Sequence, residues 1–499
     1  MAIKNINIDK PEDLYDVCII GSGPAGLTLC AELANTGKRI CVLESGDNKK
    51  SNFADSLRQV KNLGEVLIKP SSRERVFGGT STTWTGLSAP LDEIDMVYRT
   101  YLSFHSGWPI TITDLKPYYE RASAYGFPKF EELNDSSLLQ KRFSNKVTYS
   151  FTNLQSKIFM ATVPPWNFKE KLQHIFDIKN IDLYLNSTVV NLNSKRTMSG
   201  QVEVISAEIF SKSGLKQQIL SKIFVLATGG IESSRLLLMS RNTNPSGLGN
   251  EHDQVGRYIM NHPKNNFGIL KLKKPIRNLA YFYSSLNGNL EGYFGLRVRD
   301  DFQRSKGILN SYIRLEPIFP SFRNFKFSSF LTNFLDILFY FFNRLIGRDS
   351  TTKTIEIRNF MEMEPKPENR ITLSNELDLC GLPIPEVKLN TSPLDRQSLS
   401  TLHKVFAEEI KRTGIGLLEG DLEKENSWPI TIDASHHLGG TRMGSDPMTS
   451  VVNSDLRVHS VNNLYVSSGS VFPTSGCANP TYTICALSVR LADKLKTIL

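Results

Sequence analysis

Apolar runs and a glycine turn alternate near the start of the chain. The segment 16–20, an aspartate followed by four apolar residues, leads directly into the turn 21–26, which reads Gly-Ser-Gly-Pro-Ala-Gly. An apolar stretch with helical spacing (27–35) follows, and then a second segment (39–43), an arginine followed by four apolar residues. Short apolar runs bounded by glycine are typical of buried strands. The order strand, helix, strand predicts a parallel sheet covered by helices.

The same pattern recurs in the middle of the chain, where the apolar run 223–227 enters a Thr-Gly-Gly turn and a helical stretch at 232–239. This second unit predicts the far side of the same nucleotide-binding domain. Apolar and polar positions alternate instead in 270–272, 292–298 and 313–315, which predicts half-buried antiparallel strands.

These patterns predict an α/β fold with two domains. We expect a Rossmann-like nucleotide-binding domain that is assembled from discontinuous segments, and a substrate domain that is built on an antiparallel sheet. The expected boundaries are 1–100, 180–265 and 430–499 for the first domain, and 101–179 and 266–429 for the second.

Residues 322–348 form an aromatic-rich insertion in the expected substrate domain, flanked by arginine and lysine. Asp336 and the short apolar runs argue against a membrane-spanning helix, which needs about 20 apolar residues. A helix lying in the membrane interface, with its cations at anionic headgroups, fits better. A dimer contact, a lid over the active site and a buried core helix stay open as alternatives. With a membrane contact, the substrate could be a lipid-linked sugar or the electron acceptor a quinone.

Composition and charge exclude several classes of protein. A chain of 499 residues that is 40% hydrophobic and 22% charged is globular and large enough for two or three domains. The net charge of +9 comes from basic residues spread along the chain without a nucleic-acid-binding module, so we expect no nucleic-acid partner.

The six cysteines include no C-x-x-C pair, so we expect no metal site and no disulfide framework. The polar N-terminus does not resemble a secretory signal, which predicts a cytoplasmic location, or the inner face of the membrane if the insertion binds there.

The turn 21–26 matches the dinucleotide-binding pattern G-x-G-x-x-G in the strand–turn–helix context that makes it specific. Its glycines permit a tight turn and close approach of the backbone to a pyrophosphate, whose charge the helix N-terminus stabilises. Glu44 ends the second strand, at the usual position of a carboxylate that binds a ribose hydroxyl. The loop 75–86, rich in glycine, serine and threonine, suits a flat ligand, although a surface loop can have the same composition. The turn alone leaves FAD and NAD open.

The C-terminal region carries candidate chemistry in His436-His437-Leu438-Gly439-Gly440-Thr441-Arg442-Met443-Gly444 and in Asn479-Pro480-Thr481. A histidine suits the removal of a hydroxyl proton near neutral pH. If the first segment is extended, its two histidines point to opposite faces and only one meets the substrate. Asn479 also suits the N-cap of a helix with Pro480 in the first turn, and both roles stay open. His262 and His459 have no obvious partner nearby in the sequence and are expected to be structural.

Together these motifs resemble the glucose-methanol-choline (GMC) family of FAD-dependent oxidoreductases over nearly the whole chain. The resemblance rests on the turn 21–26, the Gly78-Gly79 loop, 107–110, 118–119, 225–232, 255–257, His262-Pro263, 368–373 and, most specifically, 463–481. Within the family, 437–444 and 81–85 are most similar to the pyranose 2-oxidase-like sugar oxidoreductases.

The resemblance implies an FAD that is held non-covalently, because Thr83 stands where those relatives have a histidine that carries the flavin. By its place in the motif, His437 is implied as the catalytic base, and Asn479 is implied to hydrogen-bond the same substrate oxygen. The implied cofactor-binding residues are Gly21, Gly23, Pro24, Ala25, Gly26, Glu44, Arg75, Gly78, Gly79, Thr83, Trp84, Thr85, Val189, Ala227, Gly229, Gly469, Ser470, Asn479, Pro480 and Thr481.

The resemblance therefore predicts oxidation of an alcohol group on a small molecule, a sugar or cyclic polyol, with proton transfer to His437 and hydride transfer to the flavin. A helix after Asn479 would direct its N-terminal N–H groups at the negative charge of the reduced flavin. One alternative is an NAD-dependent dehydrogenase, which leaves the C-terminal motif unexplained. Another is a non-catalytic, membrane-associated flavin-binding protein, against which the intact His437 and Asn479 count. The electron acceptor, and with it the choice between oxidase and dehydrogenase, stays open.

Overall fold

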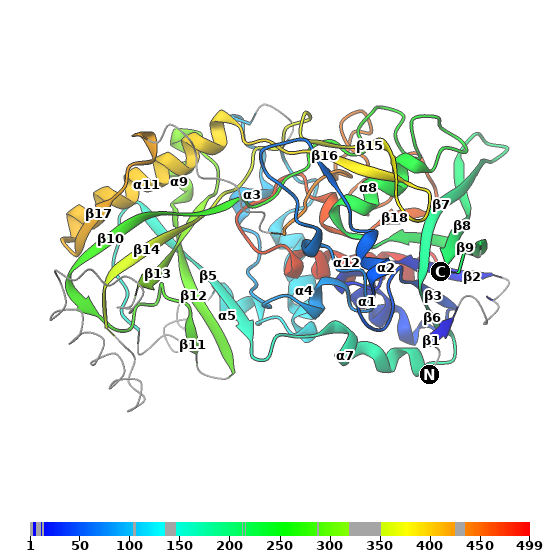
Figure 1. Ribbon diagram of the computed structural model, residues 1–499, viewed down its shortest axis with the longest axis horizontal. Helices are drawn as coiled ribbons and strands as arrows, with labels where there is room; N and C mark the ends of the chain where they lie inside the picture. Colours follow the sequence, from blue (N-terminus) through cyan, green and yellow to red (C-terminus); the bar gives the residue numbers. More distant parts are fainter. Residues whose placement is uncertain are drawn as a thin grey trace.

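The structure is a computed structural model that describes residues 3–5, 11, 14–102, 106–134, 146–211, 213–214, 216–286, 289–318, 351–424 and 435–499. Two large sheets lie toward opposite ends of the elongated molecule, and Figure 1 shows most of the helices between them and around the sheet on the right. The predicted α/β class, with a Rossmann-like part and a sheet-based second part, is confirmed.

The first sheet has the strand order β1-β6-β3-β2-β9-β8-β7, and β18 pairs with β9 off this path. Its parallel part joins β1 (Ile3–Asn5), β6 (Ile181–Leu185), β3 (Ile40–Leu43), β2 (Tyr15–Ile20), β9 (Lys216–Leu226) and β18 (Leu464–Val466). An antiparallel extension adds β8 (Val202–Ser211) and β7 (Ser187–Arg196). Strands from both ends of the chain thus lie side by side, and parallel strands bring their carboxyl ends to one edge.

The helices that follow the two glycine turns begin earlier than the pattern of apolar residues predicts. α1 spans Pro24–Leu33 and α8 spans Gly229–Met239, so each starts three residues ahead of its predicted position. Gly21 and Gly229 both have positive φ, which lets the chain reverse within the turn and enter the helix at once. The turn is therefore continuous with the first helical turn, and its N–H groups face the carboxyl edge of the sheet.

The second sheet is antiparallel, with the order β11-β12-β13-β14-β10-β17 and β5 paired with β12. The predicted alternating runs fall within its strands, which confirms them. The strands are β5 (Leu154–Thr162), β10 (Lys264–Ile276), β11 (Ser284–Leu286), β12 (Leu290–Val298), β13 (Tyr312–Ile318), β14 (Thr352–Phe360) and β17 (Gly416–Glu419). Helix α11 (Pro393–Thr413) covers one face of this sheet through Leu399, Leu402 and Phe406.

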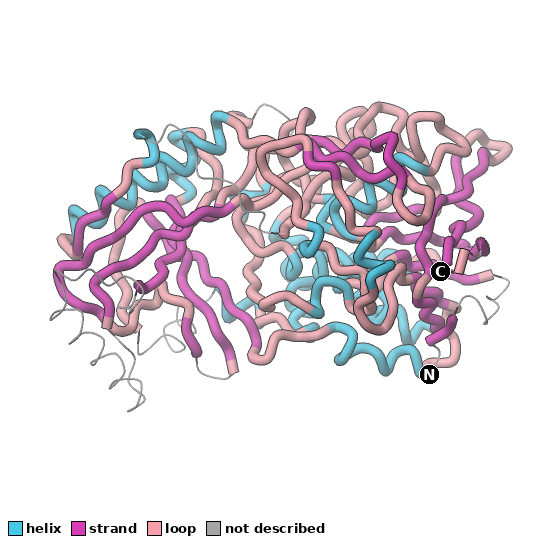
Figure 2. Tube along the Cα trace, in the orientation of Figure 1, coloured by secondary structure: helices cyan, strands magenta, loops and turns pink. Residues whose placement is uncertain are grey.

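The remaining elements connect the two sheets, and Figure 2 shows how much of this middle region is loop. A small sheet joins β15 (Arg370–Leu377), β16 (Pro383–Lys388) and β4 (Lys61–Asn62). The other helices are α2 (Asn52–Ser56), α3 (Glu93–Met96), α4 (Ile112–Ala122), α5 (Phe130–Asn134), α7 (Phe168–Leu172), α9 (Asp300–Lys306) and α12 (Thr481–Lys496).

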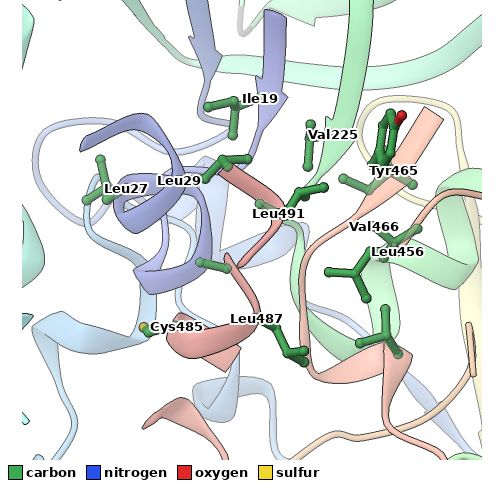
Figure 3. Packing of buried hydrophobic residues seen from close by; sticks show 14 of the residues in the cluster. Ile19, Leu27, Leu29, Val225, Leu456, Tyr465, Val466, Cys485, Leu487 and Leu491 are labelled. Atoms are coloured by element: carbon green, nitrogen blue, oxygen red, sulfur yellow. The ribbon is translucent and has the colours of Figure 1, made fainter. Parts of the chain in front are cut away.

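The main core lies between the parallel sheet and two helices from opposite ends of the chain. α1 packs against α12, and Figure 3 shows Leu29 and Leu491 together beside Ile19 and Val225 of the sheet. These side chains are fully or almost fully buried, and burying one aliphatic side chain contributes about 1.5–3 kcal/mol. This packing holds the C-terminal helix next to the nucleotide-binding turn.

Two predictions stay without a structural answer. The aromatic insertion 322–348 lies outside the described residues. Within the part of the chain that the structure describes, no helix is both long and apolar enough to cross a membrane. The domain boundaries also stay a prediction, although the strands of the first sheet all come from within the three segments proposed for the nucleotide-binding domain.

Candidate active site

A long cleft with about 1440 Å³ of empty space, part of it open to solvent, follows the carboxyl ends of β2, β3 and β9. It is lined by the turn that opens α1, the start of α8 and the segments 72–75, 187–189, 435–437, 468–469 and 480–481. Ligands of open α/β sheets bind at this edge. The cleft therefore has room for an extended ligand that reaches from the glycine turn to the histidines.

The glycines of the cleft have two distinct roles. A Cβ atom at Gly21 would lie 2.5 Å from the carbonyl oxygen of Ala227, and one at Gly26 would lie 2.0 Å from the carbonyl oxygen of Gly21, so close packing excludes a side chain at both. A Cβ at Gly23 or Gly229 would meet no atom within 4 Å, and both residues line the cleft. At these two positions the bare backbone is open to a ligand.

Glu44 follows β3 at the floor of the cleft and is 6% exposed. Its carboxylate accepts hydrogen bonds from the backbone N–H of Ser22 (3.1 Å), the Ser22 hydroxyl (2.6 Å) and the N–H of Gly46 (2.8 Å). Two carboxylate oxygens can accept about four hydrogen bonds, so these three orient Glu44 and leave acceptor capacity for a hydroxyl of the ligand.

One carboxylate pairs with three arginines in the wall of the cleft. Glu232 lies 2.5 Å from Arg73, 3.0 Å from Arg75 and 3.3 Å from Arg235. Burial alone would raise the pKa of the Glu232 carboxyl, but the guanidinium groups of Arg75, Arg235 and Arg73 outweigh it and hold this pKa at about 2. Asp378 pairs with Arg235 at 2.6 Å from the other side. Glu232 is therefore ionised at neutral pH and organises this wall.

The predicted cofactor residues are only partly gathered at the cleft. Those that line it are Gly21, Gly23, Pro24, Ala25, Glu44, Arg75, Gly79, Val189, Ala227, Gly229, Gly469, Pro480 and Thr481. Gly26, Gly78 and Ser470 are buried and do not line it, and the half-buried Asn479 does not line it either. Thr83 and Thr85 are exposed, and Trp84 donates its indole N–H to the carbonyl of Trp166 at 2.9 Å. A role of the last three in cofactor binding stays a prediction.

The two adjacent histidines point in different directions, as expected for an extended segment. His437 Nε2 lies 3.4 Å from the Ser72 hydroxyl. His436 Nε2 instead lies 3.5 Å from Asn479 Nδ2. Asn479 thus contacts His436, and the expectation that His437 shares a substrate oxygen with Asn479 stays a prediction.

His262 is the second partner of His436. The two Nδ1 atoms are 2.9 Å apart, and His262 Nε2 lies 3.3 Å from the carbonyl oxygen of Ser475. Burial lowers the pKa of His262 to about 4, although the Ser475 carbonyl and the Glu362 carboxylate act in the opposite direction. The expectation that His262 is purely structural missed its contact with His436, 174 residues away in the sequence.

Asn479 precedes the C-terminal helix but does not cap it. α12 begins at Thr481, Pro480 occupies the N-cap position, and no side chain caps this end. The expectation of Asn479 as the N-cap was therefore wrong, and its side chain is directed to His436 instead. Pro480 and Thr481 line the cleft, so the uncapped N-terminus of α12, with its N–H groups, faces the ligand space.

Sequence reasoning missed Arg73, Glu232, Ser72 and the pair of His262 and His436 as parts of one site. The sequence predicts that only one of the adjacent histidines meets the substrate, but it does not show which of them Asn479 contacts. That choice is set by contacts between segments far apart in the sequence, which local sequence patterns do not predict.

Two family models match segments of the chain that contribute residues to the cleft. A family model described as "GMC oxidoreductase" matches residues 365–488, and one described as "FAD binding domain" matches residues 14–57. The first covers the histidine segment and Asn479, and the second covers the glycine turn and Glu44.

Similar proteins extend over almost the whole chain. The fructose dehydrogenase large subunit of Gluconobacter japonicus is 23% identical over 96% of this chain and 97% of its own length. The 2-methyl-1,2-propanediol dehydrogenase of Mycolicibacterium austroafricanum is 28% identical over 96% and 95%. The crystal structure of pyridoxine 4-oxidase from Mesorbium loti superposes with a TM-score of 0.57 and 15% identity, over 96% of this chain and 99% of that one, which supports the fold.

The arginine cluster yields a testable prediction. Replacing Glu232 with glutamine removes the carboxylate that Arg73, Arg75 and Arg235 share and leaves their positive charges close together, and we expect a loss of about 2–4 kcal/mol in the free energy of unfolding at pH 7. Because its pKa is lowered from 4.5 to about 2, the contribution of Glu232 is present above pH 4.5 and is lost as the pH falls toward 2. The difference in the free energy of unfolding between wild type and Glu232→Gln, measured by urea denaturation, should therefore become smaller below pH 4.5. Glu120→Gln, which removes an exposed pair with Lys116, is the control and should cost below about 1 kcal/mol. A loss in Glu232→Gln no larger than in this control would contradict the prediction.

Proposed function

We propose that the chain, a GMC-type FAD-dependent oxidoreductase, oxidises an alcohol group of a sugar or polyol to a carbonyl, with His436 as the base. The observation that carries the proposal is that His436 lines the dinucleotide cleft and that its Nε2 lies 3.5 Å from Asn479 Nδ2. A base and an amide donor side by side can bind one hydroxyl oxygen.

FAD fits the residues of the cleft. Gly23 and Gly229 offer bare backbone where a Cβ would meet no atom, and Glu44 retains acceptor capacity for a ribose hydroxyl. Gly23 lies immediately before α1, whose N-terminal N–H groups would hold the pyrophosphate. Thr83 offers no histidine for a covalent bond to the flavin, in keeping with non-covalent binding. When bound, FAD would supply the acceptor for the hydride.

The residues of the chain then act on the hydroxyl proton. Asn479 orients the substrate oxygen through its amide N–H, and His436 Nε2 takes the hydroxyl proton as the carbon loses its hydride. Because both groups are held in place before the reaction, less entropy is lost on reaching the transition state and the barrier is lower. His437, which resemblance alone favoured as the base, is proposed instead to hold its segment through the contact with Ser72.

The substrate class is proposed from the relatives. Their names describe proteins that act on fructose and on 2-methyl-1,2-propanediol, both of which carry neighbouring hydroxyl groups. A sugar or polyol is therefore the class with which a search should begin. The electron acceptor is not part of the proposal.

The aromatic insertion supports a separate proposal, a peripheral membrane contact. Its phenylalanines and single tyrosine, together with Arg323, Lys326, Arg344 and Arg348, have the composition of an interfacial segment that meets anionic headgroups. Such a contact would suit an amphiphilic substrate or a lipid-soluble acceptor.

The activity is tested by adding sugars, cyclitols and lipid-linked alcohols to the purified flavoprotein under anaerobic conditions. We expect at least one to bleach the oxidised flavin absorbance, because hydride transfer reduces the flavin. Admitting oxygen afterwards distinguishes an oxidase, whose colour returns at once, from a dehydrogenase. A yellow protein that none of the alcohols bleaches would contradict the proposal, and a colourless protein that requires NAD would favour a nicotinamide-dependent dehydrogenase.

The assignment of the base is tested by comparing His436→Ala with His437→Ala. Since a positioned base contributes about 10²–10⁴ in rate, His436→Ala should lower kcat by at least a hundredfold and retain flavin. We expect His437→Ala to lower kcat by less than about tenfold. Asn479→Ala should lower kcat/KM by about tenfold or more, because the substrate oxygen loses its donor. The reverse order of the two histidine variants, measured as anaerobic flavin reduction, would return the role to His437.

The membrane contact is tested by sedimentation with vesicles of phosphatidylglycerol or phosphatidylcholine. We expect the full chain to sediment with the anionic vesicles, to a smaller extent with the zwitterionic ones, and less at high salt, because cations meet the headgroups. A variant that lacks residues 322–348 but retains its flavin and melting temperature should stay in the supernatant. Equal sedimentation of both proteins would remove the proposal.

A further inference from the structure

We propose that His262 is a positioning residue that fixes the tautomer of His436, so that Nε2 of His436 is the unprotonated nitrogen at the substrate. The catalytic role in this inference rests on the proposed function, but the hydrogen bonds that support it join only protein atoms. This series of hydrogen bonds runs from the Ser475 carbonyl through His262 and His436 to Asn479.

Backbone pairing places the two imidazoles together. Met260 and Leu438 form an antiparallel bridge, with N–H to carbonyl distances of 2.7 and 3.0 Å. Continuing this register by two residues sets His262 directly opposite His436, where cross-strand side chains meet. The Asn261 side-chain oxygen accepts the backbone N–H of both, from His262 at 2.8 Å and from His436 at 3.3 Å. The contact between the rings is therefore held from the main chain.

The positions of the protons follow from the partners. A carbonyl oxygen only accepts hydrogen bonds, so His262 Nε2, 3.3 Å from the Ser475 carbonyl, carries a proton. Burial keeps the pKa of His262 at about 4, so the ring is neutral at pH 7 and its Nδ1 has a lone pair. The Nδ1 of His436, 2.9 Å away, must then be the donor.

The same logic determines the other nitrogen of His436. In its neutral form the ring carries one proton, which His262 holds at Nδ1, so Nε2 is left with a lone pair. An amide nitrogen donates, and Asn479 Nδ2 lies 3.5 Å from this lone pair. Each hydrogen bond in this series thus pairs one donor with one acceptor. The basic nitrogen of His436 faces the amide of Asn479, which is the proposed donor to the substrate.

This arrangement prepares His436 for its proposed step. The substrate hydroxyl gives its proton to Nε2, the hydride of the same carbon passes to the cofactor, and the alcohol becomes a carbonyl. His436 then carries a proton on both nitrogens, and the Nδ1 proton remains bonded to His262. No proton has to leave Nδ1 before or during the transfer, because His262 accepts that hydrogen bond throughout.

Two substitutions separate the acceptor role from simple packing. His262→Asn places a side-chain oxygen where Nδ1 stood and keeps an acceptor for His436, whereas His262→Leu fills the space without one. His403→Leu is the matched control, because His403 is also buried with its pKa lowered to about 4, but it contacts Asn359 within the second sheet. Tm and flavin content are measured for all three variants.

Two readouts test the inference. In two-bond ¹H–¹⁵N spectra of holoenzyme labelled with ¹⁵N-histidine, with His436 assigned from His436→Ala, we expect the Nδ1–H tautomer in wild type, His262→Asn and His403→Leu. His262→Leu should move His436 toward the Nε2–H tautomer. With the alcohol that bleaches the flavin, kcat should fall about 10- to 100-fold in His262→Leu with little change in KM, and His262→Asn should recover it to within about threefold.

The outcomes are distinct. An unchanged His436 tautomer in His262→Leu, or equal losses of kcat in the leucine and asparagine variants, would overturn the inference. If no alcohol reduces the flavin, the proposed function fails, but the tautomer spectra still decide whether His262 orients His436. If His262→Leu does not retain flavin, His262→Asn provides the test. The inference is supported if His436 keeps the Nδ1–H tautomer in this variant and kcat stays within about threefold of wild type. A change in either would overturn it.

Discussion

The antiparallel contact between residues 256–260 and 438–440 is the constraint on which the rest of the site depends. Met260 exchanges two backbone hydrogen bonds with Leu438, and Gly440 bonds with Gly256 and Arg257 on either side. The main chain thereby ties the region that enters the second sheet to the C-terminal region. Because neighbouring side chains of an extended segment alternate, this one register decides which histidine meets Asn479 and His262.

The packing of α12 against α1 adds a second constraint. Leu491 and Leu29 lie in the same core, so the uncapped start of α12 and the start of α1 both open on the cleft. Helix N-termini carry partial positive charge, and the wall around Glu232 adds three guanidinium groups against two carboxylates. The cleft therefore presents positive charge to an anionic ligand such as FAD, while Glu44 provides a separate, negative position for hydroxyl groups.

The partner of His436 is a neutral imidazole, whereas a carboxylate is a common partner of catalytic histidines. A buried carboxylate would need further donors to offset its desolvation, and it would favour the imidazolium form of His436 before the substrate binds. A neutral His262 orients the ring through a hydrogen bond without adding charge beside it. The Glu362 carboxylate, which acts on the pKa of His262, is instead engaged by Arg99 in a fully buried pair with distances of 2.6 and 2.9 Å.

The sequence alone determined the features that depend on neighbouring residues. The glycine turn 21–26, the strands and helices around it, the position of Glu44 and the alternating strands of the second sheet all follow from local sterics and from the periodicity of apolar residues. The resemblance to a known family added the cofactor and the class of reaction, because its motifs are contiguous stretches of residues. The predicted starts of α1 and α8 were three residues too late, because the spacing of apolar residues does not show that part of a glycine turn is already helical.

Only the tertiary structure decided which side chains meet in the site. His436 and His437 are equivalent in composition and differ only in the face on which each lies, and that face is set by pairing with a segment 174 residues away in the sequence. The same holds for Glu232 and Arg73, which meet across 159 residues. Such contacts depend on the register between distant segments, and a shift of one residue would exchange the two histidines without changing any local pattern.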